Sequence, residues 1–250
     1  MKITGQNKLA IVTGGGSGIG YAITEKFVNA GIRTVIIGRD QQKLKKAKDI
    51  FGKLCIPVCF DLTDLKSIPG QVKEIVDKYG DIDILVNNAG INLKKEFTKV
   101  SDEDFNSIML TNVSSVFAIS REVAKVMIKK GRGNIINISS MASQYGLPKV
   151  IAYTASKSAI EGMTRAMAVE LSPQGILVNC IAPGFIATDM SGKALAGDAE
   201  RFRKVLSRTP LGKLGDPADI AEAAYFLSSD KSGFLTGVIL PVDGGNSIGF

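Results

Sequence analysis

The feature that most constrains the fold of this chain is an alternation of short apolar runs with longer amphipathic segments. The runs are apolar without interruption, which is typical of parallel strands covered on both faces and not of strands with one wet face. The predicted strands are Leu9–Thr13, Thr34–Gly38, Leu54–Phe60, Ile84–Asn87, Asn134–Ser139, Leu177–Ile181 and Val238–Val242.

The segments between these runs carry apolar residues at helical spacing. Ser101 followed by Asp104 resembles a capping box at the start of one of them. Strands and helices that alternate with right-handed crossovers form an open sheet with helices on both faces. We therefore predict an α/β fold, a Rossmann-like doubly wound parallel sheet of about seven strands, in a single domain over residues 1–250. The predicted helices are Gly18–Ala30, Asp64–Tyr79, Asp102–Lys129, Tyr153–Leu171 and Pro217–Leu227.

The composition excludes several classes of protein and of mechanism. Of the 250 residues 45% are hydrophobic and 22% charged, which argues against a disordered or fibrous chain. The chain has three cysteines, Cys55, Cys59 and Cys180. An odd number indicates reduced thiols better than it indicates a disulfide framework. Because the chain has no histidine, a Ser-His-Asp triad and a His-ligated zinc site are both excluded, and we expect no metal.

The N-terminal residues, the apolar runs and the net charge indicate where the protein is located and what it binds. The first residues lack the apolar core of a signal peptide, and no apolar run approaches the length of a membrane span, so we expect a cytoplasmic protein with no membrane partner. The net charge of +7 comes from lysines dispersed over many segments. We therefore expect no nucleic-acid partner, and the charge favours attraction to an anionic cofactor or substrate.

A glycine-rich segment, residues 13–20, follows the first predicted strand and opens the first predicted helix. In this context glycines let the backbone approach a pyrophosphate at a helix N-terminus. The spacing is T-G-x-x-x-G-x-G and not G-x-G-x-x-G. A plain connecting loop is the alternative, but the position between strand and helix favours a dinucleotide site.

The end of the second strand indicates which dinucleotide is bound. A carboxylate at this point would accept hydrogen bonds from the ribose hydroxyls of NAD, but Gly38 stands there instead and Arg39 follows it. A guanidinium can form a forked hydrogen bond with a 2′-phosphate. The sequence therefore favours NADP(H) over NAD(H), with a surface ion pair between Arg39 and Asp40 as the alternative.

Tyr153 and Lys157 are four residues apart on a predicted helix and so share one face. A neighbouring ammonium is expected to lower the pKa of the phenol toward the neutral range, where it could exchange protons. Ser140 lies at the carboxyl end of a predicted strand, the edge where ligands bind in such sheets. Asn112 interrupts the helical pattern upstream.

Several motifs spread along the sequence belong together. They are the glycine pattern, the motif Asn87-Asn88-Ala89-Gly90, the residues Asn112 and Ser140, the motif Tyr153-x-x-x-Lys157 and the pair Pro183-Gly184. In these motifs the chain resembles the short-chain dehydrogenase/reductase family over essentially its whole length. The resemblance implies an NAD(P)-dependent oxidoreductase that acts on CH–OH groups. It also implies a homotetramer, or else a homodimer.

The same resemblance implies a role for each matching residue. Tyr153 exchanges a proton with the substrate oxygen and Ser140 hydrogen-bonds that oxygen. Lys157 lowers the pKa of the tyrosine and binds the nicotinamide ribose, and Asn112 holds a water that links Lys157 to solvent. Together with Arg39, the expected cofactor contacts are Gly14, Ser17, Gly18, Ile19, Gly20, Asp61, Leu62, Asn88, Ala89, Gly90, Tyr153, Lys157, Pro183, Gly184, Ile186 and Thr188.

Three segments beyond the strand ends are expected to contact the substrate: Ile91–Phe97, Met141–Ile151 and Asp189–Thr209. The last, residues 189–209, is interpreted as a mobile lid, with a pair of surface helices as the alternative. In the first segment Lys94 and Lys95 could pair with a carboxylate or phosphate of the substrate, or simply be exposed charges.

The sequence leaves three possible functions open. The stretch after Gly90 resembles gluconate 5-dehydrogenases, which favours an NADP(H)-dependent enzyme for a small polar hydroxy or keto compound such as a sugar acid. The segment from Pro210 to Gly245 resembles 3-oxoacyl-(acyl-carrier-protein) reductases of fatty-acid synthesis equally well. A non-catalytic dinucleotide-binding sensor is the alternative from another class, and the presence of Tyr153, Lys157, Ser140 and Asn112 argues against it, since a sensor needs only the glycine loop.

Overall fold

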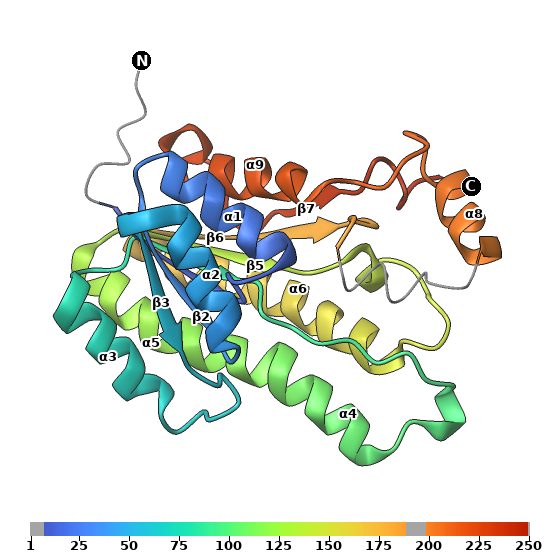
Figure 1. Ribbon diagram of the computed structural model, residues 1–250, viewed down its shortest axis with the longest axis horizontal. Helices are drawn as coiled ribbons and strands as arrows, with labels where there is room; N and C mark the ends of the chain where they lie inside the picture. Colours follow the sequence, from blue (N-terminus) through green and yellow to red (C-terminus); the bar gives the residue numbers. More distant parts are fainter. Residues whose placement is uncertain (1–7, 189–198, 250) are drawn as a thin grey trace.

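The computed structural model describes residues 8–188 and 199–249 and contains a seven-stranded parallel sheet (Figure 1). The strand order is β3-β2-β1-β4-β5-β6-β7, so the predicted fold class is confirmed. The strands are β1 (Leu9–Thr13), β2 (Arg33–Gly38), β3 (Cys55–Cys59), β4 (Ile84–Asn87), β5 (Gly133–Ile138), β6 (Ile176–Pro183) and β7 (Ile239–Val242).

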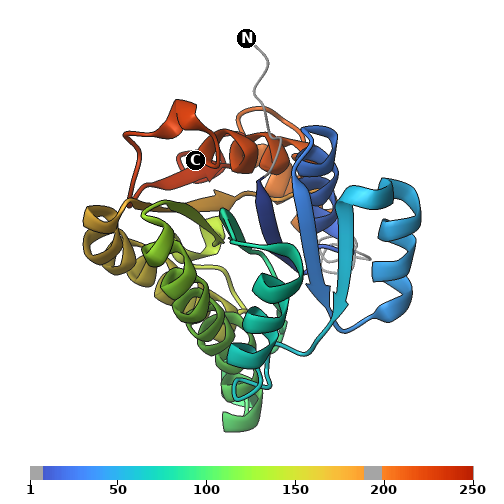
Figure 2. The same cartoon turned by 90° about the vertical axis from the view of Figure 1, so that its left-hand side faces the viewer.

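Helices cover both faces of this sheet. In Figures 1 and 2, α1 and α9 lie on one side and α3 and α5 on the other. Helix α2 packs beside α1, and α6 lies on the face of α3 and α5. The helices are α1 (Gly18–Asn29), α2 (Gln41–Phe51), α3 (Ile68–Tyr79), α4 (Asp102–Met109), α5 (Ser115–Lys130), α6 (Ile151–Leu171), α8 (Ala199–Arg208) and α9 (Pro217–Leu227).

Strand β1 shows why the apolar runs are uninterrupted. Leu9 and Ile11 enter the core cluster beneath α3 and α5, whereas Ala10 and Val12 enter the cluster beneath α1 and α9. All four side chains are fully buried. Because both faces of the strand are covered, neither of the alternating sets of positions can be polar.

Some element boundaries differ from the sequence prediction. Helix α3 starts at Ile68 and not at Asp64, because backbone hydrogen bonds from Asp64 to Asp61 and from Ser67 to Asp64 form turns before it. The helix predicted over Asp102–Lys129 is divided into α4 and α5 by a π-helical turn at Leu110–Ser114. The predicted capping box of Ser101 and Asp104 at the start of α4 is confirmed.

The strand order reverses between β1 and β4, which is where ligands bind in sheets of this type. Thr13, the last residue of β1, connects β1 at this point with β4 and the loop that follows it. Its hydroxyl donates to Val86 O (3.3 Å) and accepts from the backbone N–H groups of Asn88 (2.9 Å) and Ala89 (3.0 Å). The side-chain amide of Asn88 donates back to Thr13 O at 2.9 Å, so the two chain segments are joined in both directions.

The glycine loop packs against the same bridge. Gly14 has a φ of 68°, in the left-handed region that favours glycine. A Cβ on Gly20 would lie 2.3 Å from Gly14 O and 2.5 Å from Asn88 Nδ2. The first turn of α1 therefore lies directly on the loop, and only glycine at position 20 permits this close approach.

Among the described residues, no helix has both the length and the apolar character that crossing a bilayer would require.

The contact at Gly20 gives a test of this packing. We expect Gly20→Ala to lower the free energy of unfolding by about 1–3 kcal/mol, because its methyl group would overlap backbone that cannot move freely. Gly70→Ala, on α3 where nothing lies within 4 Å of an added Cβ, is the matched control and should be neutral or slightly stabilising. Urea unfolding of both variants measures this, and equal stabilities would contradict the close packing.

Candidate active site

Ser140, Tyr153 and Lys157 meet at the carboxyl end of β5. Ser140 lies two residues after the end of the strand and caps a short 3-10 turn, where its hydroxyl accepts a hydrogen bond from Ala142 N (3.1 Å). The Ser140 hydroxyl is the polar neighbour that acts to lower the pKa of the Tyr153 phenol. Lys157, one helical turn after Tyr153 on α6, places its Nζ 5.6 Å from the centre of the phenol ring.

Asn112 lies in the π-helical turn and is buried next to the same centre. Its side chain accepts from Ile91 N (2.8 Å) and donates to Ile91 O (2.9 Å) and to Ser156 Oγ (3.0 Å). A Cβ on Gly90 would lie 3.3 Å from Asn112 Oδ1 and 3.7 Å from Lys157 Nζ. The structure thus brings Asn112 together with the other three predicted residues, while its amide group joins the β4 loop to α6.

The protonation of the pair differs from the sequence expectation. Burial raises the pKa of Tyr153, and the neighbouring Ser140 hydroxyl opposes this rise only in part. Burial also lowers the pKa of Lys157 from 10.5 to about 8. The expected lowering of the tyrosine pKa by Lys157 is therefore wrong for the chain alone. The ammonium donates to Ile138 O at 2.7 Å, and the dry surroundings disfavour both charged forms.

Glu161, one turn beyond Lys157 on α6, is a neighbour of this centre that the sequence analysis missed. Its buried carboxylate accepts hydrogen bonds from the hydroxyls of Ser139 (2.9 Å) and Ser143. Ser140 O lies 2.6 Å from the same Ser143 hydroxyl and shares its single proton with Glu161. These bonds fix the chain on both sides of Ser140. The spacing of Tyr153, Lys157 and Glu161 along one helix face is the signal that could have revealed it.

A cavity of about 170 Å³ opens beside the glycine loop. Thr111 and Ser115, which also line it, were not predicted, because nothing in the sequence connects the α4–α5 junction with this site. The predicted cofactor residues that line it are Gly14, Arg39, Asp61, Leu62, Ala89 and Gly90.

The N-terminus of α1 faces the loop without a side-chain cap. Ser17 precedes the helix and makes no capping hydrogen bond, and no acidic residue stands in the first turn. The backbone N–H groups there, together with the helix dipole, can therefore receive an anion. Thr188 lies close by, since a Cβ on Gly18 would be 3.6 Å from its methyl carbon.

Arg39 and Asp61 form the outer end of this cavity. Their side chains are 3.7 Å apart, and Asp61 also accepts from the backbone N–H and hydroxyl of Thr63 (2.9 and 2.8 Å). The hydrogen bonds from Thr63, and then the Arg39 charge, lower the pKa of Asp61. Asp40 instead caps α2 by accepting from Gln42 N and Lys43 N, so the alternative ion pair between Arg39 and Asp40 is not formed.

Other predicted cofactor residues use their side chains to build the fold. The amide of Asn88 is occupied by Thr13 O, and Ile19 packs against the core under α1 and α9. Ile186 is buried in that same core, so only its backbone can face a ligand. Pro183 ends β6, and a Cβ on Gly184 would lie 2.7 Å from Asp243 Cα.

The three segments expected to contact the substrate all contribute to a second cavity, of about 470 Å³. Lys94 lines it, but Lys95 does not and pairs with Asp104 at 2.5 Å, so the two lysines do not act together. Of the predicted lid, residues 189–198 lie outside the described part of the chain, and Ala199–Arg208 form α8. The cavity is lined by Lys94, Tyr145, Gly146, Leu147, Pro148, Lys149, Phe185, Glu200, Lys204, Val205, Arg208 and Asn246.

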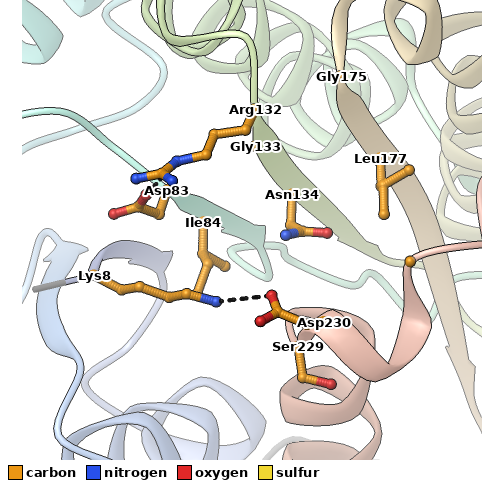
Figure 3. Close-up of a pocket in the computed structure, with 11 residues that line it drawn as sticks. Lys8, Asp83, Ile84, Arg132, Gly133, Asn134, Gly175, Leu177, Ser229 and Asp230 are labelled. Carbon is orange, nitrogen blue, oxygen red and sulfur yellow. Dashed lines mark ion pairs between the residues drawn. The ribbon is translucent and has the colours of Figure 1, made fainter. Parts of the chain in front are cut away.

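A further cavity, of about 420 Å³, lies at the opposite, amino-terminal edge of the sheet (Figure 3). Lys8 and Asp230 form an ion pair across it at 3.7 Å, and Asn134 and Arg132 also line it. None of the predicted site residues lines this cavity. Ligands of open α/β sheets bind at the carboxyl ends of the strands, so this is not the active site.

Residues 14–247 match the model of a family described as enoyl-(acyl carrier protein) reductase. A 3alpha-hydroxysteroid dehydrogenase from Mediterraneibacter gnavus is 41% identical over 245 residues, 96% of each chain. The 3-oxoacyl-(acyl-carrier-protein) reductase of Thermotoga maritima is 39% identical over 246 residues, which cover 96% of this chain and 98% of the relative.

Solved structures agree with these matches. A candidate NAD(P)-dependent gluconate 5-dehydrogenase from Beutenbergia cavernae, solved with NADP at low occupancy, has a TM-score of 0.93 at 35% identity and covers 98% of both chains. A 3-ketoacyl-(acyl-carrier-protein) reductase from Brucella melitensis, solved with NADH, has a TM-score of 0.91 at 32% identity, covering 96% of this chain and 98% of that one. The present chain belongs to the short-chain dehydrogenase/reductase family of oxidoreductases, which act on CH–OH and keto groups, and the resemblance stated from the sequence is confirmed.

The buried ammonium of Lys157 makes stability depend on pH. Because the pKa falls from 10.5 to about 8 on folding, the folded chain binds fewer protons than the unfolded chain between these values, and stability rises with pH there. The rise relative to Lys157→Met should be on the order of 3 kcal/mol. Urea unfolding at several pH values measures it, with Lys129→Met on the exposed face of α5 as the control. Parallel curves for the wild type and Lys157→Met would contradict the lowered pKa.

Proposed function

We propose that this protein is an NADP(H)-dependent oxidoreductase that transfers hydride between nicotinamide and a secondary alcohol or ketone, and that its substrate is a small polar hydroxy or keto compound such as a sugar acid. The observation that carries this proposal is the meeting of Tyr153, Ser140, Lys157 and Asn112 at the carboxyl edge of β5. Two cavities adjoin this edge, one at the glycine loop and one at the predicted substrate loops.

The residues around the glycine loop fit a dinucleotide. Gly18 and the uncapped start of α1 leave backbone N–H groups available for a pyrophosphate, whereas the N–H of Gly14 donates to Ile37 O at 2.7 Å. Leu62 and Asp61 would border the adenine, and Arg39 would bind the 2′-phosphate of NADP. When bound, the dinucleotide supplies or accepts the hydride, and the protein provides position and proton transfer.

In this proposal Tyr153 is the group that exchanges a proton with the substrate oxygen. Its raised pKa keeps the phenol protonated at neutral pH, so the chain starts with an acid ready for the reduction of a ketone. Ser140, the polar neighbour of the phenol, would donate to the same oxygen and hold it within reach. The proton leaves Tyr153 Oη for the oxygen that becomes the alcohol.

Lys157 stabilises the phenolate that this step leaves behind. With a pKa of about 8 it is mostly protonated at neutral pH. Its charge, 5.6 Å from the centre of the phenol ring, would stabilise the phenolate once the proton has left, although burial keeps the pKa of the resting phenol raised. It would also donate to the nicotinamide ribose. Asn112, beside Lys157 in the π-helical turn, would hold the water that returns a proton from solvent, and the wider backbone ring of such a turn supports this role.

The substrate cavity favours a small polar compound with negative charge, because its charged lining consists of four basic residues and Glu200. Reduction of a 3-oxoacyl group carried by acyl carrier protein is the second candidate, favoured by the Thermotoga maritima relative. The steroid named for the Mediterraneibacter gnavus relative was not suggested by any motif of the sequence.

A homotetramer or homodimer is proposed as the assembly, and the cytoplasm as the location. Large apolar side chains on the outside of the chain, Phe117, Val169 and Phe234 among them, support self-association, since extensive exposed apolar surface is typical of an interface.

Tyr153→Phe tests the proposed chemistry. We expect it to lower turnover by roughly 10²–10⁴-fold, because the proton donor is lost while the ring is kept. Affinity for NADPH should stay within about threefold, since the glycine loop is untouched. NADPH consumption with 5-ketogluconate, an acetoacetyl thioester and a simple diketone measures turnover and compares the substrate classes, with Tyr79→Phe on α3 as the control. Unchanged turnover would refute the role of Tyr153.

Arg39→Ala tests the choice of cofactor. The exposed ion pair of Arg39 with Asp61 is weak, so a 2′-phosphate can compete for the guanidinium. We expect the KM for NADPH to rise roughly 10- to 100-fold and the KM for NADH to change by less than about threefold. Lys45→Ala on α2, where the lysine pairs with Asp49 at 2.6 Å, serves as the control. Equal losses for both dinucleotides would defeat the argument.

A further inference from the structure

The substrate cavity of about 470 Å³ contains three basic side chains that come from two separate parts of the chain, besides Lys94. Lys149 comes from the loop after β5, and Lys204 and Arg208 lie one turn apart on α8. Within the described ranges, none of these three forms an ion pair, whereas lysines such as Lys73 and Lys78 on the outer helices do. Glu200 is the acidic residue in the lining, so positive charge predominates.

Arg208 is held in one orientation. Its guanidinium carbon lies 4.0 Å from the centre of the Tyr145 ring, and its Nε donates to Asn246 O at 3.1 Å. The aromatic ring and the hydrogen bond of Nε fix the orientation of the guanidinium. Its two terminal nitrogens remain as a planar pair of donors, here called the fork. No partner for that fork exists among residues 8–188 and 199–249.

Asn246 is the buried residue that fixes this arrangement, with 0% of its surface exposed. Its side-chain amide donates to Thr209 Oγ1 (2.7 Å) and Val205 O (3.4 Å), which joins it to α8. Its Oδ1 accepts from the hydroxyl of Tyr145. Arg208 and the ring beneath it are therefore anchored to one interior group, so little side-chain entropy remains to be lost when a ligand binds.

Lys149 adds an independent indication of function. Among the described residues other than glycine it alone has a positive φ, 69°, a conformation that is strained for a side chain with a Cβ. Its carbonyl accepts from Lys95 N at 2.8 Å, and Lys95 is itself paired with Asp104, so neighbouring contacts maintain the strain. Strained residues of this kind gather at ligand sites.

We infer that this cavity binds the carboxylate of a small hydroxy or keto acid, with the guanidinium fork of Arg208 as its principal contact and Lys149 and Lys204 as supporting charges. The planar fork matches a carboxylate by two parallel hydrogen bonds. Tyr145, on which Arg208 stacks, follows the short turn that begins at Ser140, so the anion site and the proposed reacting centre share one loop. One part of this inference rests on the proposed function, namely that the hydroxy or keto group at the other end of the bound acid is the group that reacts.

Calorimetric titration of the NADP-loaded protein with gluconate tests this inference. Glucitol, which has the same carbon chain without the charge, and 4′-phosphopantetheine, the arm of an acyl carrier, are the comparison ligands. We expect gluconate to bind and Arg208→Gln to weaken its Kd roughly 10- to 100-fold, the usual effect of losing a charged hydrogen-bond partner. Lys204→Gln should weaken it by up to about fivefold.

Arg203→Gln is the matched control, because Arg203 is exposed on α8 but does not line the cavity. It should leave the Kd for gluconate within about twofold, and an equal loss in both arginine variants would overturn the inference. Binding of 4′-phosphopantetheine in place of gluconate would overturn it in favour of a carrier arm. Should Arg208→Gln fail to fold, Arg208→Lys keeps the charge without the fork and should still weaken gluconate more than Arg203→Gln does.

Turnover of 5-ketogluconate separates this inference from the proposed function. A KM that rises in Arg208→Gln with little change in kcat supports both. Binding of gluconate that depends on Arg208, without any turnover of keto acids, supports the anion site and refutes the proposed substrate. Turnover with an unchanged KM in Arg208→Gln leaves the proposed function standing and overturns the anion site.

Discussion

The hydroxyl of Thr13 joins the two halves of the sheet at the point where the strand order reverses. It accepts hydrogen bonds from two backbone N–H groups of the loop after β4 and donates one to β4 itself. The side chain of Asn88 donates a further hydrogen bond to the end of β1. Parallel strands that diverge here leave a crevice whose backbone groups would otherwise lack partners. Because this bridge closes the base of the crevice, the glycine loop and Gly90 are held in position on either side of it.

Those parts of the molecule that depend on local patterns could be predicted from the sequence. The strand ends at Thr13, Gly38 and Asn87 follow from apolar runs broken by polar or turn residues, whereas β6 continues past its predicted end at Ile181. The grouping of Tyr153 with Lys157 follows from helical spacing alone. Each of these signals lies within a few neighbouring residues, where secondary structure fixes which side chains share a face or an edge.

The contacts that the sequence analysis missed join segments that are distant along the chain. Glu161 finds its donors at Ser139 and Ser143 on another element, and Arg208 finds its anchor at Asn246, 38 residues away. The pKa of Tyr153 was misjudged for a similar reason. The spacing of Tyr153 and Lys157 shows that a cation is near, but the degree of burial, which decides the sign of the shift, comes from tertiary packing.

The π-helical turn at Leu110–Ser114 has a consequence for anyone who compares or redesigns this region. It contains one residue more than a regular helix would need, and the surplus is what turns Asn112 toward Ile91 and Ser156. Deleting one residue there would let α4 and α5 join as one regular α-helix whose outer faces stay in phase, because the π-helical turn already accommodates the extra residue. Such a deletion would leave the packing of α4 and α5 largely in place and would remove the local geometry that brings Asn112 to Ile91 and Ser156.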